Sequence, residues 1–267
     1  MQAAASRVPH AASPMVVVPH REAAAAFTGR SFGNVSYLVG SGEPEQARRA
    51  LAPAIGAAPD RIVFAEQVHS AAVAVVGGDA AGAGLTDHRG AIPGVDALVT
   101  SEPGLALAVL TADCIPVLLA GPGVVAAAHA GRAGLMSGVL EATVAAIAGL
   151  GVAAADLTVL LGPAIDGCCY EVEEELAQAF GAGTTTTWGS PSIDLRATAA
   201  STLHALGVGR VGRVGGCTRC STDTWFSHRA VTDGRQPAGP HGRQAAVIAR
   251  CVPPSTHDLH VSPEWLS

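Results

Sequence analysis

Residues 105–131, LALAVLTADCIPVLLAGPGVVAAAHAG, contain the pattern that decides the fold of this 267-residue chain. Three apolar runs, at 105–111, 116–119 and 124–129, are separated by an Asp-Cys segment and by a Gly-Pro-Gly turn. Runs that are apolar throughout are typical of strands with both faces covered, whereas half-exposed strands alternate. We therefore predict buried strands within a layered protein.

Further runs extend this pattern on both sides. Strands are predicted at 61–64, 72–76, 97–100, 157–161, 211–215 and 244–249. Helices are predicted at 41–56, 135–150, 171–180 and 194–207, and a surface loop is predicted at 184–192. Because strands and helices do not strictly alternate, we expect an α/β (α+β) fold with mixed sheets.

The chain contains no linker, repeat or low-complexity block, so residues 15–267 are predicted to form a single domain. Residues 1–14 lack the apolar run of a secretory signal and are expected to be a disordered tail, with Met15 as an alternative start. The longest uncharged apolar stretch, 114–128, is too short and too interrupted by proline and glycine to cross a bilayer. A cytoplasmic monomer is expected.

The charge composition excludes several function classes. The net charge is −6 and only 14% of residues are charged, which argues against nucleic acid or an anionic membrane as a partner. All 16 basic residues are arginine. The chain therefore cannot use a Schiff-base lysine, a phosphate-loop lysine or a Ser–Lys dyad. Any anion must be bound by arginine, backbone or metal.

His69, Cys114 and His129 each lie at the end of a strand-like run. Two imidazoles and one thiolate suit Zn²⁺ or copper, and three protein ligands leave a fourth position open, as in catalytic sites. We expect the three ligand atoms to lie within about 4 Å of one another without metal. Spacing alone leaves the alternative that they are ordinary buried side chains.

The remaining cysteines are predicted to be structural. Cys217 and Cys220 have metal-ligand spacing, but a zinc ribbon needs a second such pair. Cys168 and Cys169 are vicinal and are not expected to supply it. We therefore predict that Cys217 and Cys220 bind no metal and lie away from His69, Cys114 and His129.

Six motifs occur in order along the chain: EQVH (66–69), TADCIPV (111–117), AHAG (128–131), GPAIDGCCYEV (162–172), CT (217–218) and FSHR (226–229). With these motifs and a late GRQAA (242–246), the chain resembles the YfiH family from about Phe27 to Ile248. This family is also called the laccase-domain or multicopper polyphenol oxidase family, and its members are regarded as purine nucleoside phosphorylases.

The resemblance implies a layered α/β/β/α fold and phosphorolysis of adenosine, inosine, guanosine and methylthioadenosine, together with adenosine deamination. The implied partners are purine nucleosides and phosphate. His69, Cys114 and His129 match the family's metal ligands, here for Zn²⁺ or Cu²⁺. Arg30 matches an arginine near the family's active site and is expected to bind phosphate and to take part in catalysis.

Three further residues are candidates for the same site. Asp113, beside Cys114, is a candidate catalytic acid or a positioning group for a histidine. Gln67 and Arg132 are candidate substrate contacts. Arg132 stands where the family usually has tryptophan, which exchanges a flat apolar surface for a permanent positive charge. A weaker contact with the purine ring and retained phosphate binding are expected.

Other functions remain open at this level. Cys114 could act as the nucleophile of a metal-free thiol hydrolase or deamidase, with His129 or His69 as its base. The protein could also bind a metal or a nucleoside without catalysis. True laccase chemistry is discounted, because multicopper oxidases use paired H-x-H motifs and none of the ten histidines forms such a pair.

Overall fold

The computed structural model describes residues 15–180, 183–234 and 240–250. Its strands are β1 (Met15–His20), β2 (Ala23–Phe27), β3 (Ile62–Phe64), β4 (Val73–Val75), β5 (Ala97–Thr100), β6 (Ala106–Thr111), β7 (Ile115–Gly121), β8 (Val124–Ala130), β9 (Thr158–Leu161), β10 (Thr184–Thr185), β11 (Pro191–Ser192), β12 (Arg210–Arg213) and β13 (Gln244–Arg250). Its helices are α1 (Pro44–Ala54), α2 (Arg132–Met136), α3 (Val139–Gly149), α4 (Glu174–Ala179), α5 (Leu195–Ala205) and α6 (His228–Thr232). The predicted tail at 1–14 and the end of the predicted domain, 251–267, lie outside the described residues.

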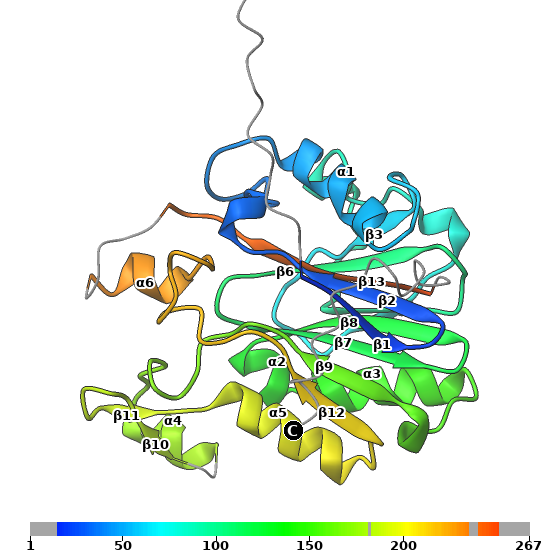
Figure 1. Ribbon diagram of the computed structural model, residues 1–267. Helices are drawn as coiled ribbons and strands as arrows, with labels where there is room; N and C mark the ends of the chain where they lie inside the picture. The colour runs from blue at the N-terminus through cyan, green and yellow to red at the C-terminus, as the bar shows by residue number, and fades with distance from the viewer. Residues whose placement is uncertain (1–14, 181–182, 235–239, 251–267) are drawn as a thin grey trace, which may run out of the picture.

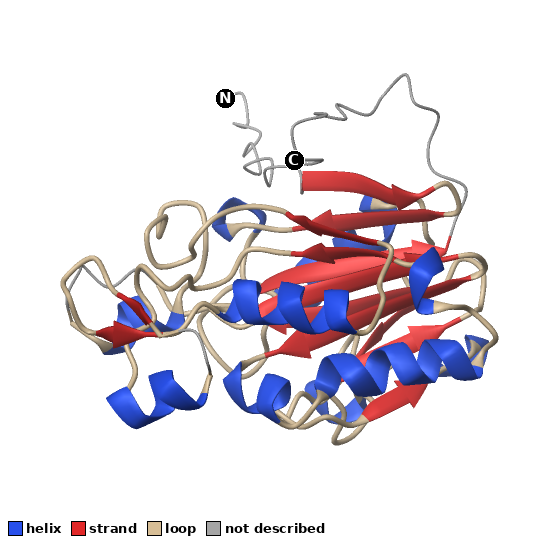
Figure 2. Ribbon diagram, turned by 90° about the horizontal axis from the view of Figure 1, so that it is seen from below, coloured by secondary structure: helices blue, strands red, loops and turns tan. Residues whose placement is uncertain are grey.

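Two mixed sheets form the centre of the molecule. One has the order β1-β2-β13-β6-β3 and the other the order β12-β9-β7-β8-β5-β4. Figure 1 shows α1 above the first sheet and α3 and α5 below the second, which gives four layers. The short β10–β11 hairpin lies to one side of the sheets (Figure 2). The expected α/β/β/α arrangement with mixed sheets is therefore confirmed.

Side-chain alternation explains why the strands are apolar throughout. Leu118 of β7 packs in the core between the two sheets, with Phe27 of β2. Its neighbours Val117 and Leu119 face the other way and pack in the layer that contains residues of α3 and α5. Successive side chains of a strand point to opposite faces, so a strand covered on both faces must be apolar at every position.

The stretch 105–131 connects the two sheets rather than forming three neighbours in one. Strand β6 belongs to the first sheet, whereas β7 and β8 pair with each other in the second. The chain crosses between the sheets at 112–114, so the Asp-Cys segment lies where the end of β6 in one sheet meets the start of β7 in the other. Asp113 has a φ of 90°, which makes this crossing a tight turn rather than an extended segment.

Most predicted strands and helices are confirmed with small shifts of their boundaries, and the differences have local causes. The helix predicted at 135–150 is divided into α2 and α3 at Gly138, which has a φ of 88°. The helix predicted at 171–180 begins later, at Glu174, and the loop predicted at 184–192 contains a hairpin. Strand β2 was not predicted because its alanine run has little strand propensity, yet it is fully buried between β1 and β13.

Within the described residues, no helix is both long and apolar enough to span a membrane. The monomeric state and the cytoplasmic location expected from the sequence stay predictions.

Candidate active site

Three ligand-type side chains converge at one edge of the two sheets. His69 follows β3, Cys114 lies in the crossing before β7, and His129 lies near the end of β8. The Cys114 Sγ is 4.0 Å from the His69 Nε2, and the rings of His69 and His129 are 4.8 Å apart at an angle of 76°. Their three ligand atoms lie within 4.8 Å of one another, slightly wider than expected. The structure thus brings together all three predicted metal ligands.

Asp96, just before β5, positions both histidines. Its fully buried carboxylate accepts a 2.8 Å hydrogen bond from Nδ1 of His129. It also accepts backbone N–H bonds from Val68 at 3.2 Å, His69 at 3.0 Å and Ser70 at 2.6 Å. These bonds stabilise His69 in the left-handed region, at a φ of 62°. One carboxylate therefore orients the loop of the first histidine and the ring of the second.

The electrostatics of this group favour a thiolate. Burial alone would raise the pKa of Asp96, but hydrogen bonds from His129 and Ser70 outweigh it and lower the pKa to about 2. Burial opposes the charged form of His129, while hydrogen bonds to Asp96 and Cys114 raise its pKa to about 9. Burial opposes the Cys114 thiolate, while hydrogen bonds with His129 and His69 lower the pKa of Cys114 to about 6. A thiolate is the form that acts as metal ligand or nucleophile.

The three residues fit a metal ion in donor type and orientation. A tetrahedral Zn²⁺ with Zn–N of about 2.0 Å and Zn–S of about 2.3 Å keeps two nitrogens and one sulfur about 3.3–3.5 Å apart. Movements of an ångström or less would bring these side chains to that spacing. The bond from Nδ1 of His129 to Asp96 leaves Nε2 for the metal, the usual carboxylate–histidine–metal arrangement.

The packing around Gly131 explains why the AHAG motif ends in glycine. A Cβ at this position would lie 2.7 Å from the Cys114 Sγ and 3.2 Å from Cδ2 of His69. Any side chain here would therefore press against two of the three candidate ligands, Cys114 and His69. The close approach of this backbone to the site requires glycine.

The His-Cys-His group opens into a cavity of about 630 Å³. Its charged lining includes four arginines and two carboxylates, namely Arg48, Arg132, Arg229, Arg243, Glu66 and Asp113. The excess of guanidinium groups suits an anionic ligand. Tyr170 also lines the cavity, and burial, followed by the charge of Cys114, raises the pKa of its phenol. Its hydroxyl is therefore a neutral hydrogen-bond donor at physiological pH.

Asp113 lies in a turn, where consecutive side chains can face the same cavity. Both Asp113 and its neighbour Cys114 line the cavity. One oxygen of Asp113 accepts a 2.6 Å hydrogen bond from the Thr218 hydroxyl, and the other accepts a 2.6 Å bond from the backbone N–H of Arg229. Asp96, rather than Asp113, is the carboxylate that orients one of the candidate ligands, His129.

The predicted substrate contacts occupy three different environments. Arg132 lies at the cavity wall, where its charge acts to lower the pKa of Tyr170. Gln67 lines the cavity, but its amide bonds both the N–H and the carbonyl of Leu110, at 2.8 and 2.7 Å. Arg30 is not brought to the cavity, since its guanidinium donates to the carbonyl of Thr222.

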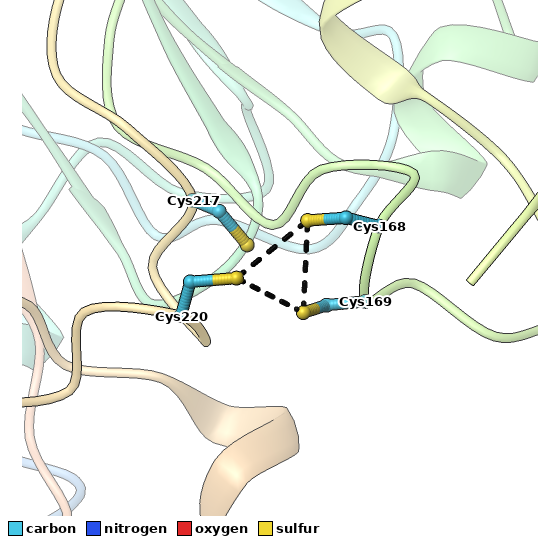
Figure 3. A group of neighbouring side chains, drawn as sticks. All are labelled: Cys168, Cys169, Cys217 and Cys220. Carbon is cyan, nitrogen blue, oxygen red and sulfur yellow. Dashed lines mark hydrogen bonds between the residues drawn. The ribbon is translucent and has the colours of Figure 1, made fainter. Parts of the chain in front are cut away.

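The two cysteine pairs form a second group, contrary to the expectation that Cys168 and Cys169 would not join Cys217 and Cys220. The sulfurs of Cys168, Cys169, Cys217 and Cys220 lie within 4.8 Å of one another (Figure 3). The vicinal pair therefore does complete a set of four, because two loops that are distant in sequence meet here.

The residues of the site that were not among the predicted ones include Asp96, Tyr170, Arg229 and Arg243. The last three lie in the quoted motifs, and their position there could have identified them as site residues. Asp96 belongs to no quoted motif. Only the fold, which pairs β5 with β8, brings it to His129.

Together these features define a class of protein: a four-layered mixed α/β fold with a His-Cys-His group in an arginine-rich cavity. The family model described as multi-copper polyphenol oxidoreductase laccase matches residues 34–251. The chain belongs to this family, which is also known as the YfiH family.

Relatives and solved structures agree with this assignment. The chain is 47% identical over 195 residues to "Purine nucleoside phosphorylase SCO2081" of Streptomyces coelicolor, covering 70% of this chain and 78% of that protein. It is 33% identical over 204 residues to "Adenosine deaminase RL5" of an unknown prokaryote, covering 71% and 78%. The crystal structure of YlmD from Geobacillus stearothermophilus superposes with a TM-score of 0.78 at 31% identity, covering 88% of this chain and 94% of that one.

Proposed function

We propose that this protein is a metal-dependent purine nucleoside phosphorylase that acts on adenosine, inosine, guanosine and methylthioadenosine. The observation that carries the proposal is the opening of the His-Cys-His group into a cavity rich in arginine. The name of the Streptomyces coelicolor relative supports the same reaction. A cavity of about 630 Å³ is within the size range of small-molecule sites.

His69, Cys114 and His129 would hold Zn²⁺ or Cu²⁺. When bound, this ion would supply a Lewis acid that offsets the negative charge of phosphate. Three protein ligands leave a coordination position open, which distinguishes such a site from a closed structural one.

Arg243 and Arg132 are the candidates for binding phosphate in place of Arg30. Arg243 lines the cavity, where burial lowers the pKa of its guanidinium and the nearby Asp113 and Cys114 act in the opposite direction. A guanidinium stays charged and binds two phosphate oxygens at once. These residues would orient phosphate toward the C1′ carbon of the ribose.

Tyr170 would contact the nucleoside, whereas Asp113 would hold residues of the cavity wall in position. Departure of a purine is easier when a ring nitrogen accepts a proton or a hydrogen bond, and the Tyr170 hydroxyl is a donor in the cavity. Both oxygens of Asp113 already accept hydrogen bonds, so its role is to position Thr218 and Arg229. Gln67 likewise positions the backbone of Leu110.

Adenosine deamination is a second candidate activity of the same site. The name of the relative "Adenosine deaminase RL5" and the open coordination position of a three-ligand group favour it. The metal-free thiol hydrolase remains a third candidate, because Cys114 has a pKa of about 6 beside His69 and His129.

Steady-state turnover separates these functions. With inosine and phosphate, a phosphorylase releases hypoxanthine and ribose 1-phosphate, and release stops when phosphate is omitted. Adenosine conversion to inosine reports deamination. Loss of both reactions on chelation, with recovery on adding Zn²⁺, would exclude the thiol hydrolase. No turnover of any nucleoside, with nucleoside binding retained, would instead show a non-enzymatic binding protein.

A further inference from the structure

A cluster of four cysteines lies outside the His-Cys-His group. Cys168 and Cys169 lie in the loop after β9, and Cys217 and Cys220 lie in the loop after β12. Strands β9 and β12 are adjacent and parallel, so their carboxyl ends and the loops that follow meet at the same edge of the sheet. This topology brings together residues that are about 50 positions apart.

The sulfur positions match a tetrahedral zinc site. The Sγ of Cys168 is 3.7 Å from that of Cys169 and 3.6 Å from that of Cys220, and Cys169 and Cys220 are 3.3 Å apart. The Sγ of Cys217 lies within 4.8 Å of the others and points toward them in Figure 3. A Zn²⁺ with four Zn–S bonds of about 2.3 Å keeps its sulfurs about 3.8 Å apart.

Two hydrogen-bond donors lie against the sulfurs, and one of them, the Arg219 guanidinium, also pairs with Asp233 at 2.7 Å. The backbone N–H of Asp166 donates to the Sγ of Cys217 at 3.4 Å, and Nη1 of Arg219 lies 3.9 Å from the Sγ of Cys169. Arg219 is only 2% exposed and its guanidinium lies over the ring of Trp188 at 4.9 Å. Zinc bound by four thiolates carries a net charge of about −2, which N–H donors and a nearby cation stabilise.

The two loops are held in position by groups other than the cysteines. The Arg196 guanidinium forms a bidentate ion pair with Asp166 in the first loop, with distances of 2.8 and 2.5 Å. It also donates at 3.0 Å to the carbonyl of Gly215 in the second loop. The backbone N–H of Thr218 bonds the carbonyl of Ala164 at 3.0 Å. The thiols are therefore brought together before any metal binds.

We propose that Cys168, Cys169, Cys217 and Cys220 form a second metal site that binds one Zn²⁺ through four thiolates. Binding releases the thiol protons and involves no oxidation. Four protein ligands leave no open position, so the site is structural. Its ligands are neighbours of functional residues, because Cys169 precedes Tyr170 of the cavity and Cys217 precedes Thr218, which donates to Asp113. The zinc would fix the wall of the cavity without contacting substrate.

Two double variants of the full chain test the proposal. H69A/H129A removes two ligands of the first site and keeps all four cysteines, whereas C217S/C220S removes half of the second. Each protein is purified under reducing conditions with Zn²⁺, and bound zinc is measured by mass spectrometry. We expect about two Zn²⁺ per wild-type chain and about one in each double variant. Ser221→Ala, next to Cys220 but without a ligand atom for the site, is the control and keeps the wild-type content.

X-ray absorption at the zinc edge of H69A/H129A gives a readout independent of activity and of the first site. We expect four sulfur neighbours at about 2.3 Å. Chelation of this variant should also lower its Tm, because the ion binds only the folded chain. Since this variant retains every cysteine, the test remains decisive even when C217S/C220S fails to fold.

Three results would overturn the proposal: H69A/H129A without zinc, zinc bound by nitrogen or oxygen in that variant, or an intact mass about 2 Da low from a disulfide under reducing purification. A failed turnover assay would leave the zinc analysis of H69A/H129A unaffected. The proposed activity and the second site are thus tested separately.

Discussion

At the scale of single residues, Asp96 controls the geometry of the candidate metal centre. It is fully buried and accepts hydrogen bonds from the ring of His129 and from the backbone around His69. A carboxylate that orients a metal-ligand histidine fixes its tautomer and raises its basicity. The residue that lies behind the ligands therefore determines how well they bind.

Asp96→Asn should weaken metal binding by about 10–100-fold. An NH₂ group would replace one oxygen, and it cannot accept the hydrogen bonds that the backbone N–H groups now donate to the carboxylate. The ring of His129 would also lose its charged partner. Competition with a chromophoric chelator measures the change in affinity. Asp60→Asn, at an exposed position, is the control. An affinity equal to that of the wild type would show that Asp96 has no such role.

The alkylation of Cys114 should depend on metal and on pH. In the chelated protein the thiolate fraction should rise at about pH 6, because the two histidines lower the pKa of Cys114, rather than near the roughly 8.5 of a free cysteine. Bound metal should protect the thiol. Peptide mapping after iodoacetamide treatment from pH 4 to about pH 9 gives the midpoint for this one cysteine. A midpoint near 8.5 would contradict the contact of the Cys114 thiolate with the two histidines, and equal rates with and without metal would contradict its role as a metal ligand.

Arg132→Trp should lower the nucleoside KM by about tenfold, equivalent to roughly 1.4 kcal/mol. The indole would restore a flat apolar surface at the cavity wall for the purine ring. The phosphate KM should rise or stay the same, since a cation is lost. Steady-state phosphorolysis with each substrate varied separately measures both constants, and an unchanged nucleoside KM would refute the expectation.

At the scale of secondary-structure elements, the junctions determine the site more than the strands do. The cavity residues Cys114 and His129 lie in the crossing between β6 and β7 and near the end of β8, where the chain turns into α2. The backbone of Gly131 at this turn packs against the thiol, and Gly138 divides α2 from α3. These two glycines have different structural requirements, one for close approach and one for a positive φ.

Gly131→Ala and Gly138→Ala should therefore give opposite results. The Cβ added at Gly131 would lie 2.7 Å from the Cys114 Sγ, so metal affinity should fall by tenfold or more while the Tm of the chelated protein changes little. At Gly138 the φ of 88° makes alanine unfavourable by about 1–2 kcal/mol, so the Tm should fall with metal affinity retained. Metal titration and thermal unfolding of both variants separate the two effects. Equal metal affinities would show that the site tolerates the methyl group.

At the scale of the whole molecule, the candidate metal centre joins the two sheets. His69 follows β3 of one sheet, whereas His129 belongs to β8 of the other. An ion bound by both would oppose separation of the layers, in addition to the shared core that contains Leu118 and Phe27. Metal bound at this position should contribute to global stability as well as to activity.

Chelation should lower the Tm of the wild type more than that of H69A/H129A. A ligand at about 100 times its Kd stabilises the folded state by about 2.7 kcal/mol, which corresponds to roughly 5–10 °C for a chain of this size. Thermal unfolding with and without chelator measures both drops, and their difference belongs to the His-Cys-His centre. Identical drops would mean that this centre binds no metal in the folded protein.

The sequence by itself determined the buried strands, the layered α/β class, the family and the chemistry of the three ligand residues. These features depend on residue type and on patterns within a few positions, such as unbroken apolar runs and the TADC and AHAG motifs.

Only the tertiary structure decided which distant groups act together. Asp96 and His129 are 33 positions apart, and Cys169 and Cys220 are 51 apart. No local pattern specifies such pairs, because they depend on which strands become neighbours and on where their loops meet. For the same reason the crossing at 112–114 placed Asp113 in the cavity, whereas Arg30 bonds the backbone of Thr222 instead.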